Sequence, residues 1–421
     1  MKSIETKRVK IVNNKTLIVT VDISKMTNVG YCRCPDGTDT KPFKFNNNGQ
    51  GFNYFWSRIT QMKNTYSMEE VVFGFESTGP YGEPLIHFMK KRDVELIQVN
   101  PMHTKRVKEL QGNSPNKTDE KDPKVIADII ELGHALTVVI PEGSAAELRR
   151  LTTARERAMQ RRTSLFNQLQ DLEFVIFPEF SLVFKDVKTK SAMFILEHFP
   201  APQSIVKFKP ECLTMVLGKV SRGKLGEERV EKLYEAAETT VGIMEGQRSI
   251  LFEIKETLAT IKTTERFVAE LENEMSRHLK AIPYSKFLLS IKGIGEITVG
   301  GLIGEVGDFR NFNTIGEVLK HAGLDLFEIS SGIHKGQRHI SKRGRSLMRK
   351  LLFFVALNVV RKGGIMHEQY QKHLEGGMLK MKALIAISRK MLGIMFALVR
   401  DHSNYIENYV EIEKLKLKEA A

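Results

Sequence analysis

The chain has 421 residues, with 64 Lys and Arg against 50 Asp and Glu, and a net charge of +14 at pH 7. This length exceeds one ordinary core, so we expect two or three domains, and 42% hydrophobic with 27% charged residues excludes a disordered chain. Because Lys and Arg are spread along the whole length, the charge favours a nucleic-acid partner, the alternative being a merely soluble basic protein.

The cysteines and the apolar runs indicate a cytoplasmic protein. Cys32, Cys34 and Cys212 supply one CxC and no second pair, which argues against a structural zinc site and fits a reducing compartment. The N-terminal stretch MKSIETKRVK lacks the apolar core of a secretory signal. The longest apolar run, LLFFVALNVV, is about half a membrane span and predicts a buried helix. We therefore expect no membrane partner.

Residues 14–140 alternate between strand and helix patterns. The expected elements are, in order, strands KTLIVTVDIS, VGYCRC and KPFKFN, helix GFNYFWSRITQMK, strand EEVVFGFES, helix EPLIHFMKKR, strand VELIQVN, helices around HTKRVKEL and from Pro123 to Leu132, and the apolar segment ALTVVI. Three strands in a meander, then helix–strand–helix–strand, predict a mixed α/β sheet with helices on its faces. This is the element order of the RNase H-like fold.

Two later segments carry apolar residues on alternating three- and four-residue steps. They are Leu148, Leu151, Ala158, Leu165, Leu169 and Leu172 in the first, and Leu251, Ile254, Leu258, Ile261, Val268 and Leu271 in the second. Two core helices of one bundle or an intermolecular coiled coil would both give this pattern. Because both segments are long and charged outside the stripe, we expect a coiled-coil arm that dimerises. Residues 177–228 between them predict an irregular insertion with basic ends.

From Pro283 onward the chain is again helical and punctuated by glycine, as in SIKGIGEITVGGLIGEVGDF. A short helix, the turn Gly293-Ile294-Gly295 and a second helix predict a helix–hairpin–helix, whose backbone N–H groups bind phosphate without reading sequence. A plain helical hairpin with glycines for close packing is the alternative. The expected division is 1–142, an RNase H-like catalytic domain; 143–282, a coiled-coil and dimerisation region with an insertion; and 283–421, a mostly α-helical domain.

Four acids stand where RNase H-like nucleases carry active-site carboxylates. Asp22 lies on the first strand, Glu76 ends the fourth, and Asp119 and Asp122 begin the last helix, where positions i and i+3 share a face. Clustered carboxylates repel one another, and a pair of Mg²⁺ (or Mn²⁺) ions, which prefer oxygen ligands, would offset this and contact a phosphate. A solvated surface charge is the alternative for each acid, and it is weakest for Asp22 within its apolar strand.

Several segments resemble a known family. VDISK, FESTGPYG, VNPMHTKRVKELQG and KTDEKDPKVIAD are similar to the N-terminal DEDD (RuvC-like) domain of the insertion-sequence one-ten family of transposases. IKGIGEITVGGLIGEVGDFRNF, AGLDLFEISSGIHKGQRHISKRGRSLMRKLL and KALIAISRKMLGIMFAL are similar to its C-terminal serine transposase domain. The resemblance implies a DNA recombinase of a bacterial insertion sequence, active at the nucleoid. It would be guided by a structured bridge RNA that pairs with donor and target double-stranded DNA, and would act as a dimer of dimers, a tetramer on DNA.

The same resemblance implies the roles of single residues. The four acids would be catalytic and hold the metal, and Ser331 would be the nucleophile, although Ser330 precedes it and Ser341 is a third candidate. Proline at position 123 replaces the alanine usual in the family. Because proline suits only a first helical turn, we expect the helix to begin there, with Asp122 as its cap.

Cations near the serine would gather a scissile phosphate, while the serine itself needs a base or a metal to react. The residues expected to bind nucleic acid are Lys117, Gly293, Gly295, Lys335, Arg338, Lys342, Arg343 and Arg345. A metal-dependent nuclease or Holliday-junction resolvase, with water as the nucleophile, is the alternative function. A non-enzymatic architectural protein is a third, but it would have no use for four converging acids.

Overall fold

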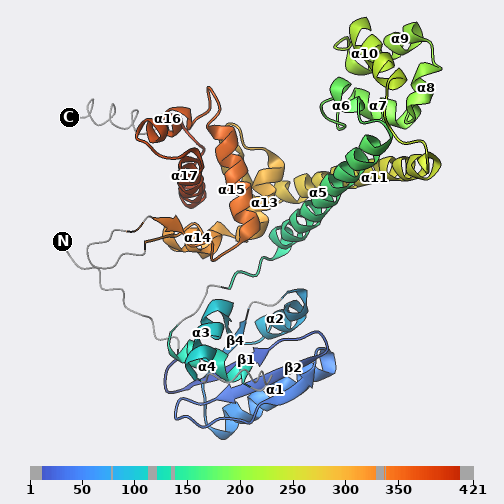
Figure 1. Cartoon of the computed structure of the whole chain (residues 1–421). Helices are drawn as coiled ribbons and strands as arrows, with labels where there is room; N and C mark the ends of the chain where they lie inside the picture. The colour runs from blue at the N-terminus through green and yellow to red at the C-terminus, as the bar shows by residue number, and fades with distance from the viewer. Residues whose placement is uncertain are drawn as a thin grey trace, which may run out of the picture. The chain divides into compact units, whose positions relative to one another are not determined.

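The computed structural model describes residues 12–76, 79–111, 121–133, 138–328, 336 and 338–407 (Figure 1). The chain divides into two compact units, Met1–Val139 and Ile140–Ala421. Among the described residues, no helix combines the length and the apolar character needed to cross a membrane.

The described part of the first unit contains a mixed five-stranded sheet of order β3-β2-β1-β4-β5. Its strands are β1 (Thr16–Asp22), β2 (Thr27–Arg33), β3 (Phe43–Asn46), β4 (Glu70–Glu76) and β5 (Glu95–Val99). The first three form an antiparallel meander, and β4 and β5 run parallel to β1. Parallel neighbours require crossovers, which α1 (Gly49–Thr65) and α2 (Glu83–Lys90, after the short turn η1, Pro80–Gly82) provide. The predicted meander and mixed sheet are confirmed.

Each face of this sheet has its own apolar core, because strand side chains alternate between faces. Leu17, Val19 and Val21 of β1 pack with residues of α1 and α2. Ile18 lies on the opposite face, in a core formed with α4 (Asp122–Glu131). The helix α3 (Pro101–Gln111) precedes α4.

The start of α4 differs from the expected one. Lys121 occupies the N-cap, Asp122 is the first helical residue, and Pro123 follows within the first turn. The expected cap, Asp122, is therefore wrong by one position. After α4, the described residues 138–140 belong to no strand, so this end of the segment ALTVVI does not extend the sheet.

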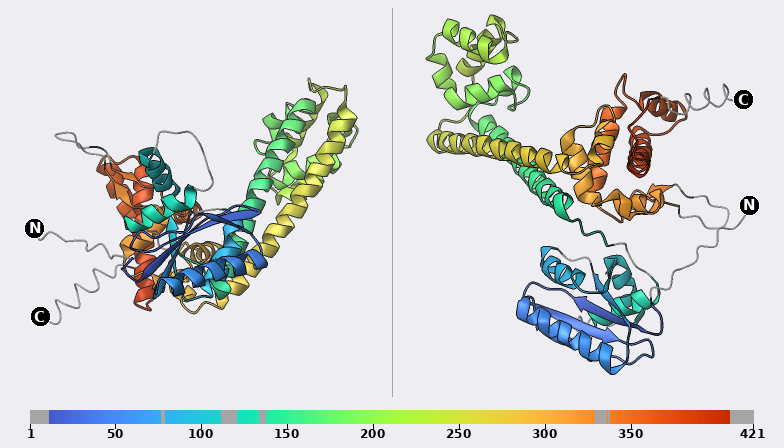
Figure 2. Two further views of the ribbon diagram at one scale, coloured as in Figure 1. Left: turned by 90° about the horizontal axis from the view of Figure 1, so that it is seen from below. Right: turned by 180° about the vertical axis from the view of Figure 1, so that it is seen from behind.

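An arm of two antiparallel helices, α5 (Gly143–Ile176) and α11 (Gln247–Lys280), begins the second unit (Figure 2). Arg155 pairs with Glu272 at 2.6 Å and Arg162 pairs with Glu265 at 2.8 Å, which fixes the register of the two helices. Ala158 of the first stripe packs with Val268 and Leu271 of the second near these ion pairs, and Leu169 packs with Ile254, Leu258 and Ile261 further towards the insertion. The stripes expected to join two protomers are thus largely covered within one chain, with Leu165 and Leu251 half-buried, and dimerisation through the arm stays a prediction.

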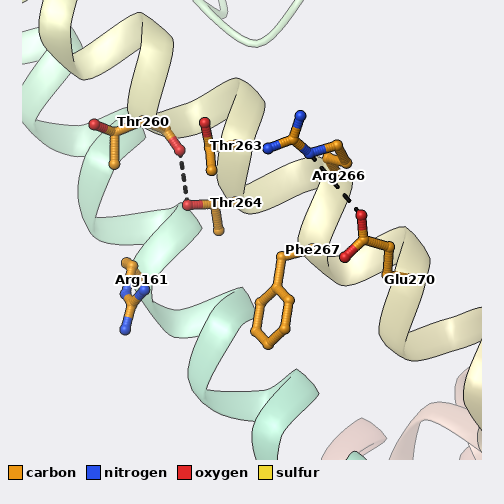
Figure 3. Close-up of a pocket in the computed structure, with 7 residues that line it drawn as sticks. All are labelled: Arg161, Thr260, Thr263, Thr264, Arg266, Phe267 and Glu270. Atoms are coloured by element: carbon orange, nitrogen blue, oxygen red, sulfur yellow. Dashed lines mark hydrogen bonds and ion pairs between the residues drawn. The ribbon is translucent and has the colours of Figure 1, made fainter.

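A shallow groove of about 440 Å³ runs between the two arm helices (Figure 3). Arg161 of α5 and Phe267 of α11 line it together with Thr260, Thr263 and Thr264. Among the other lining side chains, Arg266 lies 4.0 Å from Glu270, one turn away on the same exposed surface. Glu270 thus offsets the charge of Arg266, which leaves Arg161 as the remaining charged side chain in the lining.

The insertion between the arm helices is helical, and the expectation of an irregular segment is wrong. Residues 177–246, called the lobe below, contain α6 (Phe180–Val183), α7 (Lys190–His198), α8 (Pro202–Val206), α9 (Pro210–Ser221) and α10 (Glu227–Glu238). Their core is continuous with the adjoining ends of α5 and α11 through Leu169, Ile254 and Leu258. Because no helix in the lobe exceeds 12 residues, each apolar period is too short to recognise in the sequence.

The remaining elements are mostly helical. They are α12 (Ser285–Leu289), α13 (Glu296–Val306), η2 (Phe309–Asn311), α14 (Ile315–Ala322), β6 (Leu326–Phe327), β7 (His339–Ile340), α15 (Ser346–Val359), α16 (His367–Glu375) and α17 (Lys380–Arg400). Glycines on α13 allow it to approach its neighbours closely: a Cβ on Gly304 would lie 2.7 Å from the backbone N of Arg149, and one on Gly301 would lie 2.9 Å from Leu351.

Candidate active site

Asp22 and Glu76 end two neighbouring parallel strands. Val21 is in register with Phe75, so the next residues along, Asp22 and Glu76, are side by side at the carboxyl edge of the sheet. Val21 and Phe75 belong to the core shared with α1 and α2. Because successive side chains of a strand point to opposite faces, Asp22 and Glu76 lie on the other face of the sheet, which α4 covers. Both carboxylates are half-buried.

The first turn of α4 is held against this same edge. The hydroxyl of Thr20, two residues before Asp22, donates to the carbonyl oxygen of Pro123 at 2.6 Å, and the Thr20 side chain is fully buried. On the adjacent strand, a Cβ at Gly74 would overlap the Ile130 side chain of α4. A larger residue at position 74 would require the Ile130 side chain to shift, so α4 packs closely on β4 near its C-terminal end, while the hydrogen bond from Thr20 to Pro123 holds its first turn.

Asp122, at the start of α4, is partnered by a lysine. Its carboxylate lies 2.6 Å from Nζ of Lys108 on α3, and its side chain is 20% exposed. Asp119 and Lys117 lie outside the described residues. Within the described ranges, no group of three or more His, Cys, Asp and Glu side chains is arranged to hold a metal ion.

The expected nucleophile falls in the second unit, between β6 and β7 in the sequence. Ser330, Ser331 and Lys335 lie outside the described residues. The third candidate, Ser341, is half-buried; its N–H donates to the carbonyl of Asp325 at 2.8 Å, and its hydroxyl accepts from the N–H of Arg343 at 3.4 Å. Ser341 is therefore built into the backbone hydrogen bonding that follows β7.

The predicted nucleic-acid-binding cations differ in how they are partnered. Arg338 pairs with Glu328 at 2.9 Å, and Arg345 pairs with Glu305. Lys342 and Arg343 are exposed, and neither has an ion pair to any residue that the structure describes. Of the four, these two offer the least compensated positive charge.

A polar cluster that the sequence reasoning missed fixes the segment Ser341–Arg345. The carboxylate of Glu305 on α13 is 1% exposed and accepts from Nε and Nη2 of Arg345 at 2.8 and 3.0 Å. The carbonyl of Glu305 accepts from Nη2 of Arg149 at 2.8 Å and lies 3.0 Å from Nε2 of His321. Burial is the main cause that lowers the pKa of His321, and the nearby Arg345 and Arg149 act in the same direction. The one signal in the sequence was an acid inside the glycine-rich helix GGLIGEVG.

The two glycines of the predicted helix–hairpin–helix are not packing glycines. Gly293 has φ +93°, a conformation that favours glycine, and Gly295 is the N-cap of α13. A Cβ at either position would meet nothing within 4 Å. The alternative, that these glycines serve close packing, is therefore wrong, and the phosphate-binding role stays a prediction.

Comparison with known proteins defines the class. A family model described as "Transposase" matches residues 19–178, which include Asp22 at the end of β1, and the whole of β4 and α4. A second, described as "Transposase IS116/IS110/IS902 family", matches residues 285–371, which include the Glu305 cluster. Both matched segments thus identify the chain as a transposase. It belongs to the IS116/IS110/IS902 family of insertion-sequence transposases.

Individual relatives agree with this assignment. The chain is 23% identical over 346 residues to the insertion element IS116 uncharacterized 44.8 kDa protein of Streptomyces clavuligerus, a match covering 82% of this chain and 86% of the relative. It is 22% identical over 293 residues to the insertion element IS110 uncharacterized 43.6 kDa protein of Streptomyces coelicolor, covering 69% and 72%. It is 29% identical over 142 residues to a pilin gene-inverting protein of Moraxella bovis, covering 32% and 44%.

Proposed function

We propose that this transposase cuts and rejoins DNA strands through an RNase H-like (RuvC-like) carboxylate site and a serine nucleophile. Asp22, Glu76, Asp119 and Asp122 would form the carboxylate site, and Ser331 would attack the scissile phosphate. The observation that carries the proposal is the adjacency of Asp22 and Glu76 at the carboxyl ends of β1 and β4, on the face covered by α4. An acid pair at this place has no role in the core of the sheet.

The donor set suits a divalent cation. Carboxylate oxygens from two strands and a helix are the ligands that Mg²⁺ and Mn²⁺ prefer, and about one or two of them usually suffice alongside substrate phosphate. When bound, the metal would supply charge neutralisation and polarisation at the phosphate. Lys108 compensates the carboxylate of Asp122, so this lysine must move aside or share the acid when a cation is held.

The partners extend the proposal. Donor and target DNA follow from membership of a transposase family and from the net charge of +14. The structured bridge RNA and the assembly into dimers and tetramers rest on the resemblance of the sequence alone. The exposed cations Lys342 and Arg343 are the described groups best suited to phosphate near the serine segment.

The test separates a serine transposase from a nuclease or resolvase that uses water. Purified protein is incubated with labelled donor DNA, Mg²⁺ and the element's RNA, and both strand cleavage and covalent protein–DNA adducts are measured. Asp22→Asn should abolish both, because the carboxylate site is lost. Ser331→Ala should abolish the adduct and strand joining.

Matched controls keep the assignments independent. Glu95→Gln changes an exposed acid at the amino end of β5 and should leave both products unchanged. An adduct that persists in Ser331→Ala but disappears in Ser330→Ala or Ser341→Ala would move the nucleophile. Cleavage without any adduct in the unmodified protein would favour the resolvase instead.

A further inference from the structure

The lobe carries an open apolar groove with no part in the proposed catalytic chemistry. Its volume is about 490 Å³, and it is lined by Phe194, His198, Phe199, Phe208, Leu213 and Val216. The two matched family segments end at residue 178 and resume at residue 285, so the groove lies outside both. Figure 1 shows the lobe's helices gathered at the end of the arm where α5 stops and α11 begins.

Aromatic rings dominate the lining. Phe194 and His198, one turn apart on α7, have ring centroids 4.3 Å apart, and Phe199 lies 4.8 Å from Phe208. Leu213 forms a fully buried floor, whereas Phe208 is 37% exposed and His198 is exposed. The groove thus offers partly exposed rings above a buried leucine, and its volume falls in the range of small-molecule sites.

Three exposed lysines are close in sequence to residues that line the groove. Lys207 and Lys209 flank Phe208 in the chain, and both are exposed. Lys190 precedes Phe194 by four residues and His198 by eight, so it lies on the same face of α7. Among the described residues, none of these three lysines has an ion-pair partner. Glu211, in the first turn of α9, is the acid nearest to Lys209 in sequence.

We propose that this groove binds an unpaired base of single-stranded nucleic acid, with the flanking phosphates on Lys190, Lys207 and Lys209. Stacking on aromatic rings beside a positively charged path is how proteins hold single strands without reading their sequence. The occupant is argued from these lysines: the phosphates of a single strand would pair with them, whereas a second copy of the chain would bring the same lysines against one another.

The proposal does not depend on the catalytic one and is tested without catalysis. Full-length protein is kept in EDTA, and binding is followed by fluorescence anisotropy with labelled oligouridine, labelled oligothymidine and a labelled duplex, each about 16 nucleotides long. Phe208→Ala should weaken binding of the single strands by about 5- to 150-fold, the range for removing one stacked ring. Duplex binding should change by less than about twofold, because a paired base has no free face for the groove. The tighter of the RNA and DNA single strands identifies the natural source.

Matched variants make the outcome decisive. Phe208→Trp should retain single-strand binding, and His198→Ala, a change at an exposed side chain, should weaken it even if Phe208→Ala fails to fold. Leu182→Ala removes a 78% exposed apolar side chain elsewhere in the lobe and should have no effect. Equal losses for single strand and duplex, or unchanged binding in both Phe208→Ala and His198→Ala, would overturn the proposal. So would a change of oligomeric mass in Phe208→Ala with binding intact, since the groove would then join copies of the chain.

Discussion

The anchor between Glu305 and Arg345 predicts an asymmetry between two substitutions. The Glu305 side chain is 1% exposed, whereas the Arg345 side chain is 41% exposed. Arg345→Ala would leave a carboxylate with neither water nor an ionic partner. Glu305→Gln would leave a guanidinium that reaches solvent and keeps a neutral acceptor. The first change should therefore be the more damaging.

The magnitudes follow from burial. Removing one partner of a buried ion pair costs about 3–5 kcal/mol, which we expect for Arg345→Ala. Exchanging a charge-assisted hydrogen bond for a neutral one should cost about 1–2 kcal/mol in Glu305→Gln. In a unit as large as Ile140–Ala421, each kcal/mol lowers the Tm by about 2 °C. The expected decreases are about 6–10 °C and about 2–4 °C.

Calorimetry of the full chain measures the Tm, and amide hydrogen exchange reports the local effect. The N–H of Arg345 donates to the carbonyl of His321 at 2.9 Å, and the N–H of Lys342 donates to Gly323 at 3.0 Å. Both amides should lose protection in both variants, whereas Arg343→Ala, at an exposed neighbour, should leave them protected. A Glu305→Gln variant as unstable as Arg345→Ala would refute the argument from burial, as would unchanged exchange in the anchored segment.

Two further predictions concern single residues of the second unit. Burial, with Glu179 nearby, raises the pKa of Glu173 from its ordinary value of 4.5 to about 8, so the native state favours the protonated acid. The free energy of unfolding should therefore fall, as the pH rises between these two values, by up to about 1.4 kcal/mol per pH unit. Urea midpoints measured across this range should lack this slope in Glu173→Gln. Parallel pH profiles of the variant and the unmodified protein would contradict the prediction. Gly293→Ala places a side chain at φ +93° and should cost about 1–2 kcal/mol of stability. Gly295→Ser, at the N-cap of α13, should be neutral or stabilising. Thermal melts in which Gly295→Ser is the less stable variant would contradict this explanation from backbone conformation.

The sheet was predictable because its information is local. Each strand of the first unit is bounded by turn residues and buries apolar side chains in its own short stretch, so KTLIVTVDIS could be assigned without knowing its partners. The parallel pairing of β1 with β4 then places Asp22 beside Glu76, as the element order suggested. The Lys108 partner of Asp122 could not be foreseen, since it comes from another helix and from packing.

The second unit was harder to predict for the same physical reason. A stripe such as Leu165 and Leu169 shows that a helix has a partner but not whether that partner belongs to the same chain. Glu305 carries no periodic signal at all, because its burial depends on Arg345, forty residues later. The segment with Ser331 lies outside the described residues, so the nucleophile stays a prediction.

The chain leaves the arm for the lobe and comes back to it at nearly the same point. The N–H of Ile243, just before α11, donates to the carbonyl of Val175, at the end of α5, at 3.1 Å. The segment that leaves the arm and the segment that returns to it are therefore hydrogen-bonded to each other. Everything between them can be lengthened or excised without sliding the paired helices past one another. Removing the lobe would lower the stability of the protein without changing the order of its helices, because Leu169 and Ile254 would lose the apolar residues that cover them. If a short turn replaced the lobe, α5 and α11 should keep their register. The apolar residues exposed at that end of the arm should then promote aggregation.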